Sequence, residues 1–95
     1  MFLGIYAFEG EPATLLAAYE RLIGDIPKGN LLLHACVKRE GGIDVYDACP
    51  SREAFDGFAA SAEFRGALDS AGLPAPTVTR LGDAHAAFAQ GRRLA

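Results

Sequence analysis

A pair of adjacent glycines between two apolar runs constrains the fold of this chain most. Gly41-Gly42 separates residues 31–39 from residues 43–49, and both runs are rich in strand-forming side chains. Glycine adopts positive φ without steric cost, so the pattern is typical of the tight turn of a β-hairpin. We therefore expect one antiparallel hairpin over residues 31–49, with Gly41-Gly42 as its two-residue loop. In that register Arg39 lies opposite Asp44, which pairs opposite charges across the strands.

Side chains on a strand alternate between the two faces of a sheet, so this register divides the hairpin into two sets. The first set is almost entirely apolar and is expected to lie beneath helices: Leu33, Ala35, Val37, Tyr46 and Ala48. The second set carries four groups capable of chemistry and is expected on the opposite face of the sheet: Leu32, His34, Cys36, Val45, Asp47 and Cys49. In the expected register His34 faces Cys49. The sequence suggests a functional site on this second face.

The residues before the hairpin predict a strand and a helix. Residues 2–8 form a short apolar run with aromatic side chains, which favours a strand. Pro12 suits the first position of a helix, and apolar residues recur at helical spacing from Leu15 to Ile26. Pro27 then ends the helix.

The residues after the hairpin predict a second helix and a last strand. Ser51 is a typical N-cap, and the apolar pattern predicts a helix that is broken or bent near residues 60–61 and ends at Gly72. Residues 77–88 favour a strand that Gly82-Asp83 can interrupt. Residues 92–95 are expected to be a frayed tail.

This order of elements, βαββαβ, is that of the ferredoxin-like α+β fold, in which a four-stranded antiparallel sheet has both helices on one face. We expect residues 1–95 to form a single domain. A sheet covered on one side leaves an apolar face, and a second copy of the chain is the expected cover. The prediction is a homodimer with a cavity between the two sheets, which would receive a small apolar or aromatic molecule.

Charge and composition argue against several partners. The net charge is −3 with a pI near 5.2, so nucleic acid is not expected as a partner. No apolar run reaches the roughly 20 residues that cross a bilayer, and the N-terminus lacks a basic signal-peptide region, so we expect a cytoplasmic protein with no membrane contact. Two cysteines in a reducing compartment do not favour a structural disulfide.

His34 and Asp47 are the predicted catalytic residues. A carboxylate beside an imidazole orients its tautomer, and the resulting base can take a proton from an acidic phenol or an enolisable carbon. Leu32, Cys36, Val45 and Cys49 share their face and are predicted to bind substrate, together with His85 from the last strand. Two other interpretations stay open: either thiol as a nucleophile beside His34, or a non-catalytic protein in which these residues only hold a dimer interface.

The hairpin residues are not expected to bind a metal, and the first strand is not expected to contact a ligand. His34, Cys36, Asp47 and Cys49 are possible Zn²⁺ ligands, but neighbouring side chains on a sheet project nearly parallel, whereas tetrahedral ligands converge. We predict no metal and no cofactor. Tyr6 could hydrogen-bond a ligand, although it shares a face with Phe2 and Phe8, which favours packing in the core.

Three stretches of this sequence resemble a known superfamily. The residues are 41–47 (GGIDVYD), 51–55 (SREAF) and 61–64 (SAEF), with Phe58 between the last two. They are similar to the dimeric α+β barrel superfamily, in the branch of antibiotic biosynthesis monooxygenase-like proteins. The resemblance implies the ferredoxin-like dimer and a range of activities: cofactor-free oxygenases of polycyclic phenols, lactone isomerases, polyketide cyclases, haem-degrading enzymes and haem peroxidases.

Departures from that superfamily narrow the expected activity. The chain has no tryptophan, and its one asparagine, Asn30, is expected in a loop, whereas the haem-degrading relatives rely on an Asn-Trp-His set. Haem degradation is therefore not expected. No known catalytic residue of the superfamily can be assigned to a position in this sequence. The predicted function is a cofactor-independent monooxygenase, cyclase or isomerase that acts by proton abstraction, and the alternative is a non-catalytic ligand-binding or dimerising accessory protein.

Overall fold

The computed structural model describes residues 1–29 and 31–95, so Asn30, expected in a loop, lies outside the described residues. In this part of the chain the strands and helices follow one another as β1 (Phe2–Glu9), α1 (Pro12–Asp25), β2 (Leu33–Arg39), β3 (Gly42–Cys49), α2 (Arg52–Ala59), α3 (Ala62–Ala71), β4 (Thr77–Asp83), β5 (Phe88–Ala89) and β6 (Arg92–Arg93).

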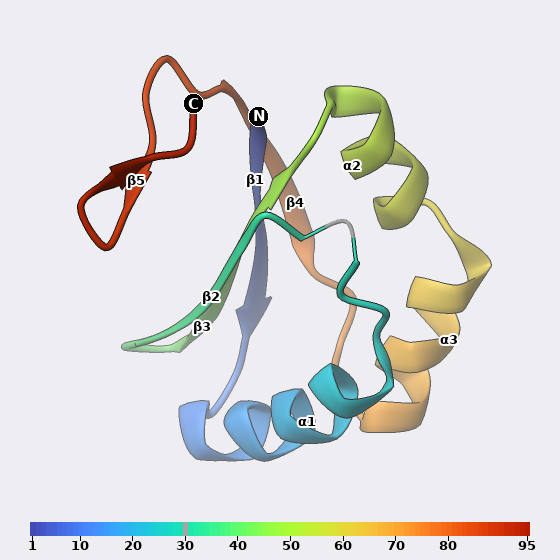
Figure 1. Cartoon of the computed structure of the whole chain (residues 1–95). Coiled ribbons are helices and arrows are strands. Elements are labelled where there is room, and N and C mark those ends of the chain that lie inside the picture. The colour runs from blue at the N-terminus through green and yellow to red at the C-terminus, as the bar shows by residue number, and fades with distance from the viewer. Residues whose placement is uncertain (30) are drawn as a thin grey trace.

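The main sheet has four antiparallel strands in the order β2-β3-β1-β4. The three helices lie together on one side of this sheet, as Figure 1 shows, and among the described residues the other side carries no helix. The predicted ferredoxin-like α+β fold is therefore confirmed. The expected second helix is split into α2 and α3, and each begins at a serine whose hydroxyl accepts a backbone N–H: Ser51 from Ala54 and Ser61 from Phe64.

The hairpin is present, but its predicted register was wrong by two residues. Arg39 pairs with Gly42, so the loop is Glu40-Gly41 and His34 lies opposite Asp47. The cause is a contact with β1: a Cβ on Gly42 would lie 2.2 Å from the carbonyl oxygen of Phe8, so this glycine is needed inside the strand. Gly41 alone in the loop has positive φ, at 82°.

The faces of the hairpin were assigned the wrong way round. A shift of two residues leaves the two sets intact, but His34, Val45 and Asp47 point toward the helices, where they line an internal hollow. Leu33 and Val37 lie on the helix-free face, 46% and 43% exposed. These three side chains therefore do not lie on the face where the sequence predicted a cavity between two sheets.

An aromatic core explains why this face is the buried one. On β1 the alternating residues Phe2, Tyr6 and Phe8 are each at most 4% exposed, and they lie on the same face as Val45 of the neighbouring strand. Phe55 of α2 is fully buried against them because Gly4 leaves it room: a Cβ on Gly4 would lie 2.0 Å from the Phe55 ring. The expected core position of Tyr6 is confirmed.

The C-terminal part also differs from its prediction. β4 ends at Asp83 rather than Phe88, after a register shift against β1 and a glycine, Gly82, with φ of 134°. Residues 92–95 are not a frayed tail, because Arg93 pairs with Phe88 in the β5-β6 hairpin. Figure 1 shows this hairpin on the side of the main sheet away from the helices.

Candidate functional site

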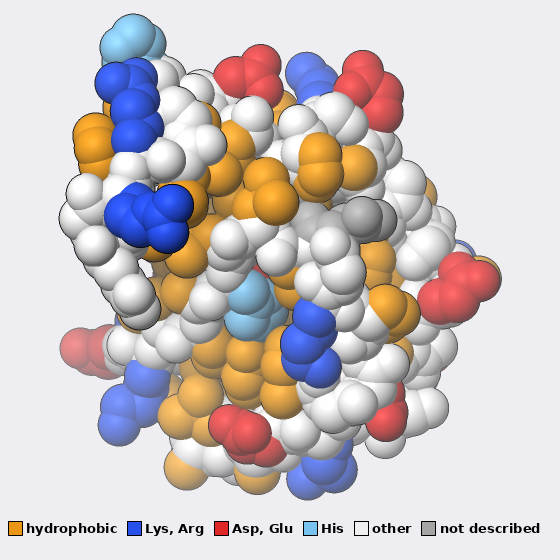
Figure 2. Space-filling model, viewed as in Figure 1, with side chains coloured by type: hydrophobic (Ala, Val, Ile, Leu, Met, Phe, Trp, Pro, Cys, Tyr) orange, Lys and Arg blue, Asp and Glu red, His pale blue; other side chains and the backbone are white. Residues whose placement is uncertain are grey.

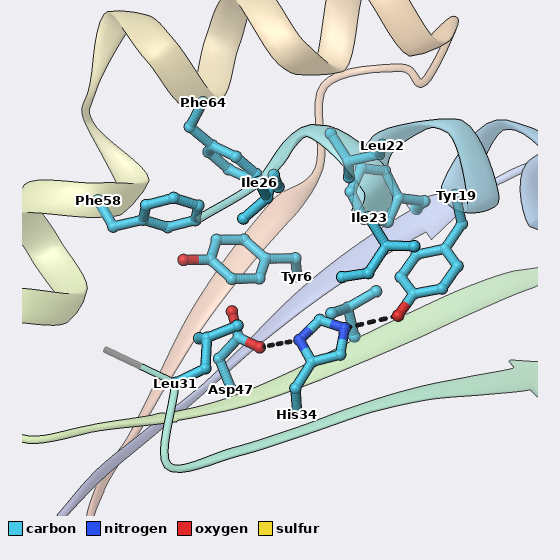
Figure 3. A pocket seen from close by; sticks show the side chains of 12 residues that line it. Tyr6, Tyr19, Leu22, Ile23, Ile26, Leu31, His34, Asp47, Phe58 and Phe64 are labelled. Carbon is cyan, nitrogen blue, oxygen red and sulfur yellow. Dashed lines mark hydrogen bonds and ion pairs between the residues drawn. The ribbon is translucent and has the colours of Figure 1, made fainter. Parts of the chain in front are cut away.

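A small hollow lies between the helices and the sheet (Figure 3). Apolar side chains of α1, α2 and α3 form much of its wall, among them Leu22, Ile23, Phe58 and Phe64. Its polar lining consists of Tyr6, Tyr19, His34 and Asp47. The cavity volume is about 20 Å³, which is room for roughly one water molecule. Figure 2 shows the molecule from the same side as Figure 1, with hydrophobic side chains gathered around a histidine in the middle of the view.

His34 and Asp47 form the centre of this site. They face each other across β2 and β3, and Nδ1 of His34 lies 2.5 Å from Oδ1 of Asp47. The Asp47 side chain is 4% exposed and the His34 side chain is 22% exposed. A carboxylate only accepts hydrogen bonds, so Nδ1 carries the proton and Nε2 presents the lone pair of a base. The two predicted catalytic residues are thus in direct contact.

Tyr19 completes a chain of three hydrogen-bonded groups. Its hydroxyl lies 2.6 Å from Nε2 of His34, and the two rings are stacked with centroids 5.9 Å apart. Burial raises the pKa of Tyr19, and the nearby Cys36 and Glu20 raise it further. The phenol therefore stays protonated and donates to Nε2.

The sequence analysis missed Tyr19 as a functional residue. Tyr19 belongs to the apolar stripe of α1, between the buried residues Leu15 and Leu22, and such a stripe is read as core. A hydroxyl within that stripe is the signal that could have identified it, because a buried phenol needs a hydrogen-bond partner.

The other predicted site residues are placed less closely together. Val45 lines the hollow, whereas Cys36, which faces the same side, is partly buried against the core and does not line it. Leu32 precedes β2 and is 49% exposed. Cys49 is buried and lines a separate pocket. His85 is exposed in the segment after β4, outside the hollow.

The two thiols are free and are held in their neutral form. Burial raises the pKa of Cys36, and Glu20 adds to the effect. Burial also raises the pKa of Cys49, with a further contribution from Asp47. Since the thiolate is the reactive species, neither position favours nucleophilic chemistry. Over residues 1–29 and 31–95, no group of three or more His, Cys, Asp or Glu side chains is placed to hold a metal ion.

A second pocket adjoins the hollow. It has a volume of about 300 Å³, and Cys49, Ala54 and Pro27 form part of its wall. Leu31 and Phe58 line both spaces, so these two side chains separate the outer pocket from the inner hollow. The outer pocket alone, at about 300 Å³, is at the lower end of the size that small ligands occupy.

Comparison with known proteins supports the fold. No protein-family model matches the sequence, and no curated protein matches it either. The structure is similar to the crystal structure of a putative antibiotic biosynthesis monooxygenase from Deinococcus radiodurans, with a TM-score of 0.66 and 12% sequence identity over 96% of this chain and 100% of that chain. This likeness confirms the fold that the sequence resemblance implied, and at such low identity it shows the fold alone. Within the described residues no helix is long and apolar enough to span a bilayer.

Proposed function

We propose that this protein binds a small aromatic or polyketide-like molecule and acts on it as a cofactor-independent monooxygenase, cyclase or isomerase. The observation that carries the proposal is the hydrogen-bonded chain from Asp47 through His34 to Tyr19, set in an apolar hollow. Proton abstraction is the step that the three reactions share, and in the oxygenase case dioxygen would be the oxidant. His34 is the proposed base.

The chemistry follows from the tautomer of His34. Asp47 holds the proton on Nδ1, so the lone pair of Nε2 is directed at the place where Tyr19 now lies. The substrate would give its proton to Nε2 and keep the electron pair as a phenolate or enolate, while Asp47 stabilises the imidazolium that forms. In this arrangement Asp47 orients the base and takes no proton itself.

The position of Tyr19 supports the proposal that the substrate carries a phenolic or enolic hydroxyl. Its own phenol is bonded to Nε2 at 2.6 Å, so a phenolic O–H fits against this nitrogen. A substrate must take the place of this hydroxyl, and it would do so most readily with a group of the same kind. The outer pocket of about 300 Å³ offers space for the rest of such a molecule.

Exchange of an enolisable hydrogen tests the proposal without knowledge of the natural substrate. The probe is 2-tetralone, and the measurement is the rate of its deuterium exchange in D₂O by NMR. The wild-type protein should accelerate exchange, and His34→Gln should reduce the rate to the background. His85→Gln is the matched control, because that histidine is exposed outside the hollow. Equal rates for the wild type and His34→Gln would contradict the proposal.

One observation favours a second function, that of a non-catalytic protein. Both ring nitrogens of His34 already have partners, and the inner cavity holds only about 20 Å³. Satisfied polar groups of this kind also occur for structural reasons alone. In that case the NMR signals of His34 should not shift when 1-naphthol or 4-nitrophenol is added. The variant His34→Ala should lower stability without any other effect.

The last part of the proposal is a homodimer formed through the helix-free face. Leu33 and Val37 expose 46% and 43% of their area on this face, and Ala35 is exposed between them. Contiguous apolar side chains on an uncovered sheet commonly mark an interface, and two copies related by a two-fold axis would cover each other's.

The molar mass in solution tests the dimer. Light scattering after gel filtration should give about twice the chain mass of 10.0 kDa. The double variant Leu33→Glu/Val37→Glu should give the mass of one chain. Ala17→Glu, an exposed position on α1, is the control and should leave the dimer intact. A wild-type mass of 10.0 kDa would contradict this part of the proposal.

A further inference from the structure

Tyr6 carries a buried hydroxyl without a partner. The residue is 2% exposed, and its hydroxyl oxygen has no hydrogen-bond partner among the described residues. Proteins rarely bury a hydroxyl in this way, because it loses its bonds to water and gains none. A phenylalanine would fill the same space without that cost, so the oxygen calls for a physical explanation.

The ring of Tyr6 is held firmly in place. It stacks on Phe55 with centroids 5.4 Å apart and meets Phe64 at 5.1 Å in a tilted arrangement. Two such neighbours fix the direction of the C–O bond, so the hydroxyl cannot turn toward solvent. The packing therefore supplies a rigid, preoriented polar atom.

The hydroxyl is directed into the candidate site. Tyr6 lines the same hollow as His34 and Asp47, and Figure 3 shows its oxygen pointing toward the side where Phe58 and Leu31 lie. Those two side chains separate the hollow from the outer pocket. A molecule that entered from the outer pocket would therefore meet this oxygen on its way to His34.

The chemical state of Tyr6 is that of a donor. Burial raises the pKa of Tyr6 far above its ordinary value, and the charge of Asp47 raises it further. The phenol thus remains protonated throughout the neutral range and can donate its O–H to an oxygen.

We infer that Tyr6 is a catalytic residue that donates a hydrogen bond to the carbonyl oxygen of the substrate, and that the substrate is an enolisable ketone. The inference rests on the proposed function. As His34 removes the proton from carbon, the electron pair of the C–H bond moves into the carbon framework and negative charge develops on the carbonyl oxygen. The Tyr6 hydroxyl stabilises that oxygen, which is the role of an oxyanion-binding group.

Tyr6→Phe tests this assignment with two readouts. Deuterium exchange of 2-tetralone should slow by about 100- to 1000-fold, as expected for the loss of one donor to a developing charge. The dissociation constant of 4-nitrophenol should rise about tenfold, whereas that of 4-nitrotoluene, which keeps the nitro group but lacks the phenolic hydroxyl, should stay within about twofold. The urea midpoint should be unchanged or higher, and a lower midpoint would overturn the inference by showing that the hydroxyl has a partner within the protein.

The two proposals can fail separately. If His34→Gln abolishes exchange while Tyr6→Phe leaves it intact, the base stands and the inference about Tyr6 is overturned. If the wild-type protein gives no exchange at all, the proposed function fails. The binding of 4-nitrophenol then tests whether Tyr6 recognises an oxygen. A selective loss of affinity for 4-nitrophenol in Tyr6→Phe would still support recognition of an oxygen by Tyr6. Equal affinity of the wild type and Tyr6→Phe for 4-nitrophenol would overturn it.

Discussion

The hydroxyl of Tyr19 lies 2.6 Å from Nε2 of His34 and occupies the position from which this nitrogen would take a proton. The contact joins α1 to the edge strand β2, which is the next element along the chain. This hydrogen bond therefore links the helix to the sheet at the wall of the hollow, and its removal should be visible in stability as well as in binding.

Tyr19→Phe should lower the free energy of unfolding by about 0.5–1.5 kcal/mol, the net contribution of one such hydrogen bond. The same change should free Nε2 and shift its ¹⁵N resonance. Urea unfolding and a ¹H–¹⁵N spectrum of the histidine ring give the two measurements. Tyr46→Phe on the opposite face of the sheet is the control, and an unchanged Nε2 resonance in Tyr19→Phe would be inconsistent with the contact.

Asp47→Asn should destabilise the protein by about 1–3 kcal/mol, because it weakens a buried bond to a charged acceptor. The Asp47 side chain is 4% exposed and lies 2.5 Å from His34. Asp44→Asn provides a comparison on the same strand: that carboxylate pairs with Arg39 near the surface, where an ion pair contributes about 0–1 kcal/mol. Urea unfolding compares the two, and equal losses would argue against a special role for Asp47.

Local signals predicted the element order as far as β4 and the helix ends, but not the β5-β6 hairpin. Pro12 begins α1, Ser51 begins the second helical region and Gly72 ends it in the left-handed conformation, as their positions in the sequence indicate. Each of these residues acts through its own backbone or through groups within a few positions, so the sequence nearby contains the information.

The register and the buried face depend on contacts with distant residues. Gly42 belongs to β3 because the backbone of Phe8 lies where its side chain would be, and that proximity is set by pairing with β1. The choice of face follows from Ile43, which is fully buried in line with the aromatic residues of β1. Neither contact can be inferred from the hairpin residues alone. Because the predicted register differed by an even number of residues, His34 and Asp47 were still placed on the same face of the sheet.

Gly4→Ala should destabilise the protein by about 1–3 kcal/mol or more, since overpacking forces a core to rearrange. The added Cβ would lie 2.0 Å from Cζ of Phe55, which is fully buried. Gly66→Ala is the matched control on α3, where the new Cβ meets nothing within 4 Å. That variant should gain about 0.5–1 kcal/mol from helix propensity. Thermal or urea unfolding measures both, and a neutral Gly4→Ala would contradict the close packing of α2 on β1.

Asp56→Asn should remove part of the acid sensitivity of the fold. The hydrogen bond from Arg80, at 2.6 Å, lowers the pKa of Asp56, and the charge of Arg52 adds to the effect. Because the folded pKa is lower than the unfolded one, near 3.9, the stabilisation is present above about pH 4 and is lost as the pH falls through the folded pKa. The difference in unfolding free energy between wild type and Asp56→Asn should thus be constant from pH 5 to 7 and shrink toward pH 2. Asp69→Asn, an exposed position on α3, should follow the wild-type profile. Urea midpoints at each pH give the comparison, and a difference that stays constant down to pH 2 would show that the charge of Asp56 does not stabilise the folded state.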